Sequence, residues 1–331
     1  MIDVSVIVVF RNEENYLVNC IQSIEDQFEQ TSLKWELLLV DGMSSDRSVN
    51  LSEEYLKQKT FDWQMIENPK KILAAGWNLG IKAAKGLYVI RPDAHAALHK
   101  GYIVEGIKTL EDKADVTAVG GLLETKAHGF WGEIIKVALS SRVGVGNSSF
   151  RTAKESSYSD TAVYALYRRA IFLKAGYFNE NLVRHQDNDM HQRIKEAGGK
   201  FYMNIAMKAD YFARDSVEKL LAQMYQIGLY LPDIMINKSV SLRHLAPFGF
   251  YLVLFLGLFA SYFITSIFAY LVMIQLGIYL SLILLDTLYK TISNKKPSLL
   301  FNIFIIPMMH INYAVGTFFG FIRITKNRLN D

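Results

Sequence analysis

The chain has 331 residues, of which 51% are hydrophobic and 21% are charged, with a formal net charge of +4 at pH 7. From residue 245 onward there are six basic and two acidic residues, which leaves 30 residues of each sign in residues 1–244. A neutral N-terminal part lacks the basic footprint of nucleic-acid binding. Cations that flank apolar runs are typical of membrane proteins. We therefore expect a membrane, and no nucleic acid, among the partners.

The single cysteine, Cys20, cannot form an intrachain disulfide and falls in a helical apolar pattern. A buried role and a reducing, cytosolic setting are therefore expected. The chain opens on a β-prone run, residues 4–10, and shows no basic n-region of a signal peptide. Membrane insertion is expected to depend on C-terminal segments.

Strand and helix patterns alternate along the first hundred residues. Strands are predicted at residues 4–10, 35–40, 64–67 and 87–90, and helices from residue 15 to about 27, at 48–59 and at 74–84. This alternation predicts an α/β fold with a mainly parallel sheet wrapped by helices. Further on, we expect a strand at 116–123, a β-like stretch at 162–167 and a helix at 190–197.

A short acidic motif follows the predicted strand 87–90. Asp93 and His95 are separated by one residue, so they share one side of an extended segment. In an open α/β sheet, ligands bind at the carboxyl ends of the strands. A carboxylate oxygen and an imidazole nitrogen there can share one divalent cation. The alternative is an ordinary loop with a solvated carboxylate.

The usual phosphate-binding motifs are absent from the sequence. No glycine-rich dinucleotide fingerprint follows the first strand, and no P-loop occurs. A nucleotide can still bind at the strand ends through its base and ribose. Asp41, directly after the second strand, is then the natural hydrogen-bond acceptor, and the alternative is a turn-forming aspartate.

Two further carboxylates, Asp187 and Asp189, stand at the start of the predicted helix 190–197. Acidic residues are favoured in a first helical turn, through capping and the helix dipole. Either side chain can instead act as a general base. The sequence pattern leaves both interpretations open.

Three uncharged apolar runs, residues 245–264, 267–285 and 299–322, are long enough to span a bilayer. The alternative is a buried soluble helical hairpin. Basic residues on both sides of the third run prevent a simple topology, so we expect a broken or re-entrant element around Pro307, or one run in the interface. His310 and Asn312 are costly in lipid and are expected to face protein or headgroups.

The ordered motifs of residues 3–235 resemble the glycosyltransferases of family 2, in particular the succinoglycan-biosynthesis (ExoA-like) branch. The matching residues are Val8-Val9-Phe10-Arg11-Asn12-Glu13-Glu14, Val40-Asp41-Gly42, Ala75-Gly76-Trp77-Asn78, Arg91-Pro92-Asp93-Ala94-His95, Gly144-Val145-Gly146-Asn147, Phe150-Arg151, Asp160-Thr161, Gly176-Tyr177-Phe178-Asn179-Glu180 and Arg184-His185-Gln186-Asp187. The resemblance implies a GT-A nucleotide-sugar-binding fold over residues 1–235, facing the cytosol. Residues 236–331 would then form a membrane region with two to three helices.

The resemblance also implies roles for individual residues. Asp41 would contact uridine, Asp93 would bind Mg²⁺ or Mn²⁺, with His95 in the place of the family's second aspartate, and Asp187 would be the general base, with Asp189 as the alternative. Further nucleotide-sugar contacts would come from Phe10, Arg11, Glu13, Lys71, Asn78 and Arg91, and contacts with the acceptor or donor sugar from Asp160, Arg184, Gln186, Gln223 and Tyr230. Gln223 and Tyr230 stand where processive relatives carry a Gln-x-x-Arg-Trp motif, whose absence favours addition of one sugar.

These expectations define an inverting transferase that moves a hexose from a nucleotide-sugar, expected to be a UDP-sugar, to a polyprenyl-diphosphate-linked saccharide in surface-glycan synthesis. The expected location is the bacterial inner membrane, with other glycan-assembly proteins as partners. One alternative acceptor is polyprenyl monophosphate. The non-enzyme alternatives are a nucleotide-sugar-binding subunit of a membrane transport complex and a scaffold with a degenerate site.

Overall fold

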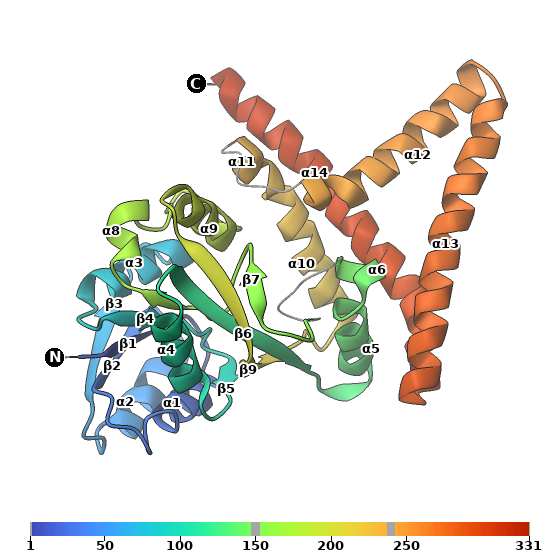
Figure 1. The fold of residues 1–331 in the computed structure, drawn as a ribbon. Coiled ribbons are helices and arrows are strands. Elements are labelled where there is room, and N and C mark those ends of the chain that lie inside the picture. The colour runs from blue at the N-terminus through green and yellow to red at the C-terminus, as the bar shows by residue number, and fades with distance from the viewer. Residues whose placement is uncertain (1, 147–152, 237–241, 331) are drawn as a thin grey trace. The chain divides into compact units, whose positions relative to one another are not determined.

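The computed structural model describes residues 2–146, 153–236 and 242–330 (Figure 1). By its contacts, the chain divides into two compact units. The first contains residues 1–125 and 149–212, and the second contains residues 126–148 and 213–331. The predicted border between residues 235 and 236 is a different kind of division, because it separates a cytosolic part from a membrane part. This border stays a prediction.

The first unit contains a nine-stranded sheet of order β3-β2-β1-β4-β8-β6-β9-β5, with β7 paired to β9. The strands are β1 (Val4–Phe10), β2 (Trp35–Asp41), β3 (Asp62–Glu67), β4 (Tyr88–Ile90), β5 (Ala96–Leu98), β6 (Val116–Lys126), β7 (Ser157–Ser159), β8 (Leu166–Arg168) and β9 (Lys200–Phe212). Neighbouring strands from β3 to β4 are parallel, as predicted. Antiparallel pairs begin at β4 and β8, so the sheet is mixed.

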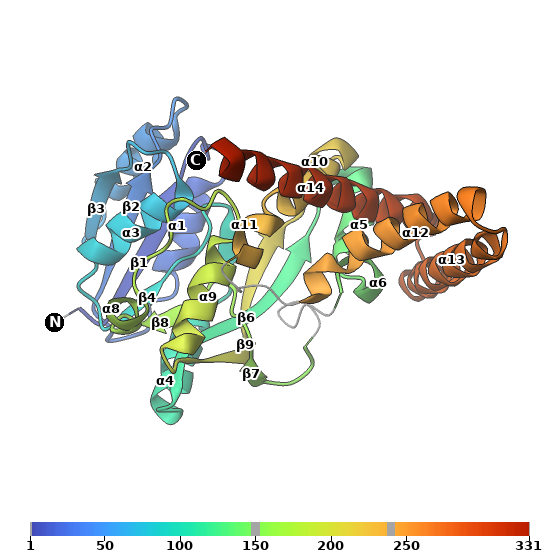
Figure 2. The ribbon, with the colours of Figure 1, turned by 90° about the horizontal axis from the view of Figure 1, so that it is seen from above.

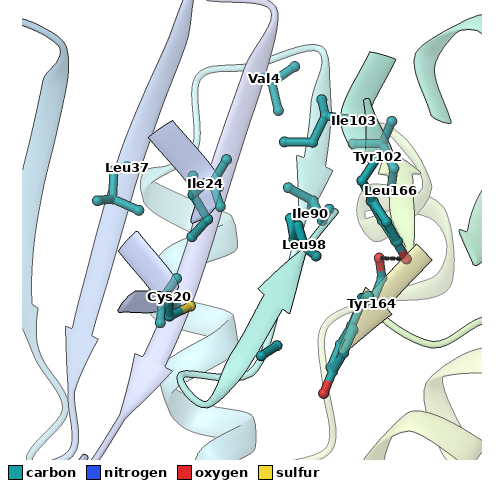
Figure 3. Close-up of a cluster of buried hydrophobic side chains, with 14 of the residues drawn as sticks. Val4, Cys20, Ile24, Leu37, Ile90, Leu98, Tyr102, Ile103, Tyr164 and Leu166 are labelled. Carbon is teal, nitrogen blue, oxygen red and sulfur yellow. Dashed lines mark hydrogen bonds between the residues drawn. The ribbon is translucent and has the colours of Figure 1, made fainter. Parts of the chain in front are cut away.

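Side-chain alternation along the central strands divides the core of this unit into two layers. Val6 and Val8 of β1 face α1, α2 and α4, whereas Ile7 and Val9 face α3, α8 and α9. The helices are α1 (Leu17–Glu25), α2 (Ser48–Leu56), α3 (Leu73–Ala83), α4 (Tyr102–Asp112), α8 (Ile171–Ala175) and α9 (Gln186–Glu196). Figure 3 shows the first layer, in which the thiol of Cys20 is buried as predicted.

Two local predictions were wrong in their bounds. The β-like stretch 162–167 forms a strand only from Leu166, because Tyr164 adopts a left-handed backbone with φ +46° that cannot continue a ladder. The helix expected at 190–197 begins at Gln186, where the left-handed His185 precedes it. Asp187 and Asp189 therefore lie inside its first turn, in agreement with their expected position at the start of a helix.

The second unit is helical. Its elements are α5 (Gly129–Leu139), α6 (Arg142–Val145), α10 (Val217–Leu229), α11 (Leu231–Ile236), η1 (Leu242–Leu245), α12 (Ala246–Phe263), α13 (Ile267–Asn294), η2 (Pro297–Phe301) and α14 (Asn302–Asn330). Among the described residues, three segments are long and apolar enough to cross a membrane: Ala246–Phe263, Ile267–Asn294 and Pro297–Lys326. They coincide with the three predicted runs.

Of the alternatives expected for the third run, a break of the helix at Pro307 is not observed, because α14 continues through this residue, and the position of one run in the interface stays a prediction. A proline removes one backbone donor, but Ile305, Ile306 and Met309 around it are buried against other helices of the unit, which keeps the segment helical. His310, on the same helix, faces protein as predicted. Its Nδ1 lies 2.8 Å from the Tyr279 hydroxyl, and its Nε2 lies 2.9 Å from a backbone oxygen of α6.

Glycines bring α10 and α14 into close backbone contact (Figures 1 and 2). A Cβ on Gly316 would lie 2.2 Å from the backbone oxygen of Tyr225, and one on Gly228 would lie 2.1 Å from that of Tyr313. Small residues allow helices to approach in this way.

We expect Gly316→Leu to destabilise the second unit by about 1–3 kcal/mol or more, because the new side chain must separate α10 from α14. Thermal unfolding in detergent measures the effect. Gly277→Leu on α13 is the matched control, since no atom lies within 4 Å of a Cβ at Gly277. Equal melting temperatures of the two variants would contradict the prediction.

Candidate active site

The carboxyl ends of the parallel strands gather the predicted site residues at one edge of the sheet. Phe10 and Asp41 are register partners at the ends of β1 and β2, and β4 ends nearby at Ile90, directly before Arg91. Because β1, β2 and β4 are parallel, the segments that follow them leave the sheet at the same edge. Asp93 and His95 lie in the segment between β4 and β5.

Asp41 is buried and closes the turn after β2. Its carboxylate accepts hydrogen bonds from the Ser44 hydroxyl at 2.6 Å and from the Ser44 amide at 3.0 Å. The turn-forming interpretation is therefore correct, and a uridine contact by the same side chain stays a prediction. Of the neighbouring candidates, Phe10 is in the core, whereas Arg11 and Lys71 are exposed.

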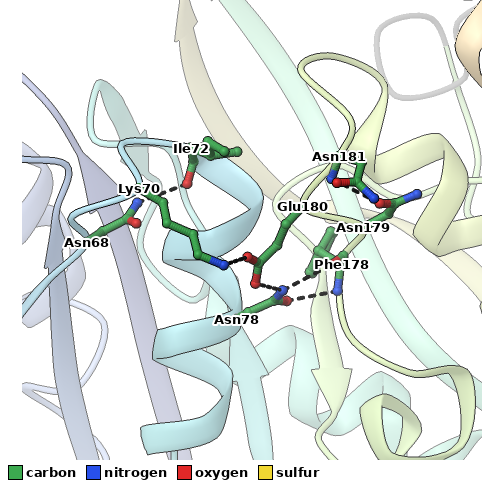
Figure 4. Close-up of polar contacts among 8 residues, drawn as sticks. All are labelled: Asn68, Lys70, Ile72, Asn78, Phe178, Asn179, Glu180 and Asn181. Atoms are coloured by element: carbon green, nitrogen blue, oxygen red, sulfur yellow. Dashed lines mark hydrogen bonds and ion pairs between the residues drawn. The ribbon is translucent and has the colours of Figure 1, made fainter. Parts of the chain in front are cut away.

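Asn78 orients a loop. Its Nδ2 donates to the Phe178 carbonyl and to Glu180, and its Oδ1 accepts from the Phe178 amide, as Figure 4 shows. Both ends of the amide are used within the protein, which is a structural role, and the predicted nucleotide contact of Asn78 stays a prediction. Lys70 pairs with Glu180 at 2.6 Å and completes the cluster.

Arg91 joins this edge to the first turn of α9. Its Nη2 donates to Oδ1 of Asp187 at 2.6 Å, and its guanidinium lies over the rings of Trp77 and Phe178, at 4.0 and 4.5 Å from their centroids. Arg91 is buried, whereas the Asp187 side chain is 51% exposed. The buried guanidinium of Arg91 thus holds the carboxylate of Asp187, which remains accessible to a ligand. The contact that the structure shows for Arg91 is the one with Asp187, and its nucleotide contact stays a prediction.

The two candidate bases differ in their surroundings. Partial desolvation acts to raise the pKa of Asp187, but the charge of Arg91 outweighs it and leaves that pKa below its usual value. Asp187 is therefore ionised at neutral pH. Asp189 is buried and paired with Arg193, whose Nη2 lies 2.8 Å from its Oδ2, one turn along α9. That pairing indicates a structural role for Asp189.

Asp93 has the environment of a cation ligand. Its Oδ2 accepts a hydrogen bond from the Tyr164 hydroxyl at 3.2 Å. Burial, reinforced by the negative charge of Asp187, raises the pKa of Asp93 above its usual value, so its charged form lacks sufficient compensation. His95 Nδ1 lies 3.4 Å from Oε1 of Glu13, which brings a third donor to this segment. Carboxylate and imidazole donors fit Mn²⁺ or Mg²⁺.

A second group of metal-competent side chains is formed by His99, Glu124 and Asp210. One ligand atom of each lies within 4.8 Å of the others. His99 Nε2 is already 2.7 Å from Asp210, and Glu124 is 3.4 Å from Lys208. We interpret the contact of His99 as a hydrogen bond to β9, and that of Glu124 as an ion pair between the neighbouring strands β6 and β9.

The remaining predicted residues are dispersed. Asp160 and Arg184 are exposed, and Gln186 is buried with its Nε2 donating to the carbonyls of Leu182 and Val183. Gln223 and Tyr230 belong to the second unit, where Tyr230 lies under the guanidinium of Arg323. The motif residues Asn147, Phe150 and Arg151 lie outside the described residues.

Five side chains of the site were missed from the sequence: Trp77, Tyr164, Tyr167, Phe178 and His191. Trp77 and Phe178 stand in motifs that were noted, but their contact with Arg91 is visible only in the fold. The two tyrosines lie three residues apart in a stretch that was assigned to a strand. A left-handed φ at a tyrosine marks local strain, as is common at functional sites, but no sequence signal reveals it.

Burial lowers the pKa of His191 from 6.5 to about 4. His191 is therefore neutral in the folded protein at pH values where it takes up a proton in the unfolded chain. We expect its contribution to stability to be complete above pH 6.5 and to be lost progressively as the pH falls toward 4. Denaturant unfolding of wild type and His191→Phe across this interval measures the effect. The variant should lose less stability than wild type, and parallel losses would assign the titration to another group.

A mixed α/β sheet with carboxylates at the carboxyl ends of its parallel strands, in a chain whose C-terminal helices are long and apolar enough to cross a membrane, fits a GT-A fold with a membrane region. The family model for glycosyl transferase family 2 matches residues 5–175. The chain belongs to this family and is a glycosyltransferase.

Two curated relatives extend the match. The chain is 28% identical over 329 residues to a dolichyl N-acetyl-α-D-glucosaminyl phosphate 3-β-D-2,3-diacetamido-2,3-dideoxy-β-D-glucuronosyltransferase of Methanococcus voltae, which covers 97% of each chain. It is 24% identical over 220 residues to the succinoglycan biosynthesis protein ExoA of Rhizobium meliloti, covering 66% of this chain and 65% of that one. The first alignment includes the C-terminal helices.

Solved structures show the same fold. The mannosyltransferase PcManGT from Pyrobaculum calidifontis, in complex with GDP-Man and Mn²⁺, superposes with a TM-score of 0.64 at 15% identity, covering 95% of this chain and 86% of that one. GalNAc-T7 with UDP, GalNAc and Mn²⁺ superposes with a TM-score of 0.52 at 17% identity, covering 65% and 45%.

Proposed function

We propose that the protein transfers one sugar, with inversion, from a nucleotide-sugar to a saccharide carried on a polyprenyl or dolichyl phosphate. The observation that carries this proposal is the placement of two carboxylates with different environments around one buried arginine. Asp187 is ionised and half-exposed, whereas desolvation raises the pKa of the partly buried Asp93, whose charged form a cation would stabilise. One suits a general base and the other suits a metal ligand.

In this mechanism, Asp187 accepts the proton of the acceptor hydroxyl as the oxygen attacks the anomeric carbon. The bond between that carbon and the diphosphate breaks on the opposite face, and the nucleoside diphosphate leaves. Asp93, together with His95 and Glu13, would hold a divalent cation. When bound, that cation would supply charge neutralisation for the leaving diphosphate. Arg91 keeps the carboxylate of Asp187 ionised and turned to the open edge.

The lipid carrier of the acceptor is supported by two observations. Three helices of the chain can cross a membrane. The Methanococcus voltae relative, which aligns from end to end, is named for an acceptor that is a sugar on dolichyl phosphate. We place the enzyme in the cytoplasmic membrane, acting in surface-glycan synthesis, with the catalytic unit on the cytoplasmic side, where nucleotide-sugars are made. UDP-hexoses remain the first donors to test.

The test measures nucleoside diphosphate release by the full chain in detergent. A panel of UDP- and GDP-sugars is supplied with Mn²⁺, together with a polyprenyl-phosphate-linked saccharide, bare polyprenyl phosphate, or no lipid. Release that needs the lipid-linked saccharide supports the proposal and identifies the donor. Release with bare polyprenyl phosphate would replace it with the monophosphate alternative. Donor binding without release under all conditions would contradict it.

A further inference from the structure

A chain of buried and partly buried hydrogen bonds extends away from the candidate base. Nη2 of Arg91, which holds Asp187 at 2.6 Å, also donates to the Tyr167 hydroxyl at 3.3 Å. That hydroxyl lies 2.8 Å from Nε2 of His191, and Nδ1 of His191 lies 2.8 Å from the hydroxyl of Thr161. These hydrogen bonds therefore connect four segments of the first unit: the residue after β4, the segment at Thr161, strand β8 and helix α9.

One arrangement of protons gives the fully buried Tyr167 hydroxyl both a donor and an acceptor. The guanidinium of Arg91 can only donate, so the Tyr167 oxygen accepts from it and uses its own proton toward His191. Nε2 of His191 must then be unprotonated, and its proton lies on Nδ1, directed to Thr161. Burial keeps the pKa of His191 at about 4, which maintains this neutral tautomer near pH 7. Each bond polarises the next in the same direction.

Helix α9 completes a closed ring of contacts, because it carries both Asp187 and His191. Asp187 and His191 are four residues apart, so they lie one above the other on the same face of the helix. Arg91 from the end of β4 and Tyr167 from β8 bridge them. Rings pack around this circuit, with Tyr167 5.2 Å from Phe172 between centroids. The rotation of α9, and with it the direction of the Asp187 carboxylate, is therefore fixed at two points.

We propose that Tyr167 and His191 are positioning residues, which act through Arg91 to hold Asp187 in the orientation that removes the acceptor proton. The proposal rests on the proposed function, in which Asp187 is the base. Neither residue touches the donor or the acceptor in this role. The alternative to this positioning role is a polar network that only stabilises the core.

Tyr167→Phe tests the proposal with the smallest change, because it removes one oxygen and keeps the ring. We expect kcat to fall about tenfold, with KM for the donor within about twofold of wild type, since a misplaced base affects the chemical step and not donor binding. Tyr88→Phe is the matched control. Tyr88 is equally buried in the adjacent β4 but belongs to the opposite core layer. Its variant should keep wild-type kcat.

Position 191 gives a second, independent comparison. His191→Phe keeps a ring beside Phe201, whose centroid lies 4.6 Å away, but it removes the acceptor for Tyr167. His191→Gln supplies an amide oxygen that can accept the same bond. We expect His191→Phe to lower kcat as Tyr167→Phe does, and His191→Gln to recover most of it, at a temperature where all variants are folded.

Asp187→Asn, measured alongside, distinguishes a failure of the positioning role from a failure of the base assignment. If Tyr167→Phe retains wild-type kcat while Asp187→Asn is inactive, the positioning role is overturned and the base assignment stands. If Asp187→Asn is itself fully active, the base assignment of the proposed function has failed. If the Tyr167 and Tyr88 variants lose stability and kcat alike, the network is only structural and the proposal is overturned.

Discussion

Asp187→Asn is expected to lower kcat for sugar transfer by about 10²–10⁴-fold, the usual contribution of a general base. The amide has the shape of the carboxylate and still offers an oxygen to Arg91, but it cannot take up the acceptor proton at neutral pH. Because donor binding does not depend on that proton, KM for the nucleotide-sugar should stay within about twofold. Steady-state release of nucleoside diphosphate, with saturating lipid acceptor, provides both constants.

Asp189→Asn is the matched control, two residues along the same helix. Its side chain is buried against Arg193, with Nε at 3.0 Å and Nη2 at 2.8 Å from Oδ2. Loss of this pair should lower the melting temperature and change kcat little. The reverse pattern, with Asp189→Asn inactive and Asp187→Asn active, would transfer the role of base to Asp189 and contradict the assignment made here.

The alternating α/β pattern could be predicted because it depends on short-range periodicity. Residues 4–10 were assigned to a strand with the observed bounds, since an uninterrupted apolar run of that length suits a strand buried on both faces. Asp93 could be placed at the sheet edge for a related reason, because it closely follows a predicted strand. Asp187 could be placed only at the start of a predicted helix, and its role as base came from the resemblance to the family.

The partners of these carboxylates could not be predicted in the same way. Arg91 and Tyr167 are 76 residues apart, and Arg91 and Asp187 are 96 residues apart, so their contact depends on strand order. Tyr167 and His191 each have ordinary surroundings in the sequence. Asn78 shows the same limit, because nothing in its motif indicates that its amide holds the loop at Phe178, 100 residues further along the chain.

Asp93→Asn is expected to abolish the metal dependence of the enzyme and to lower kcat by about 10³-fold, which corresponds to the several kcal/mol that a cation contributes at a diphosphate. An amide is a weaker ligand than a carboxylate, and the substitution removes the negative charge that Asp93 would supply to the cation. Wild-type activity should disappear with EDTA and return with Mn²⁺, whereas the variant should not respond. Electron paramagnetic resonance of Mn²⁺ in the presence of UDP gives a reading of binding that is independent of turnover.

Asp210→Asn is the control for this variant, because Asp210 also pairs with a histidine, His99, at 2.7 Å in the same unit. If these two residues form only this contact, the variant should bind Mn²⁺ and respond to it as wild type does. A normal Mn²⁺ response in Asp93→Asn, together with a lost response in Asp210→Asn, would place the functional cation at the His99, Glu124 and Asp210 group. The leaving diphosphate would then have to be assigned to that part of the sheet, and Asp93 would keep only its hydrogen bond with Tyr164.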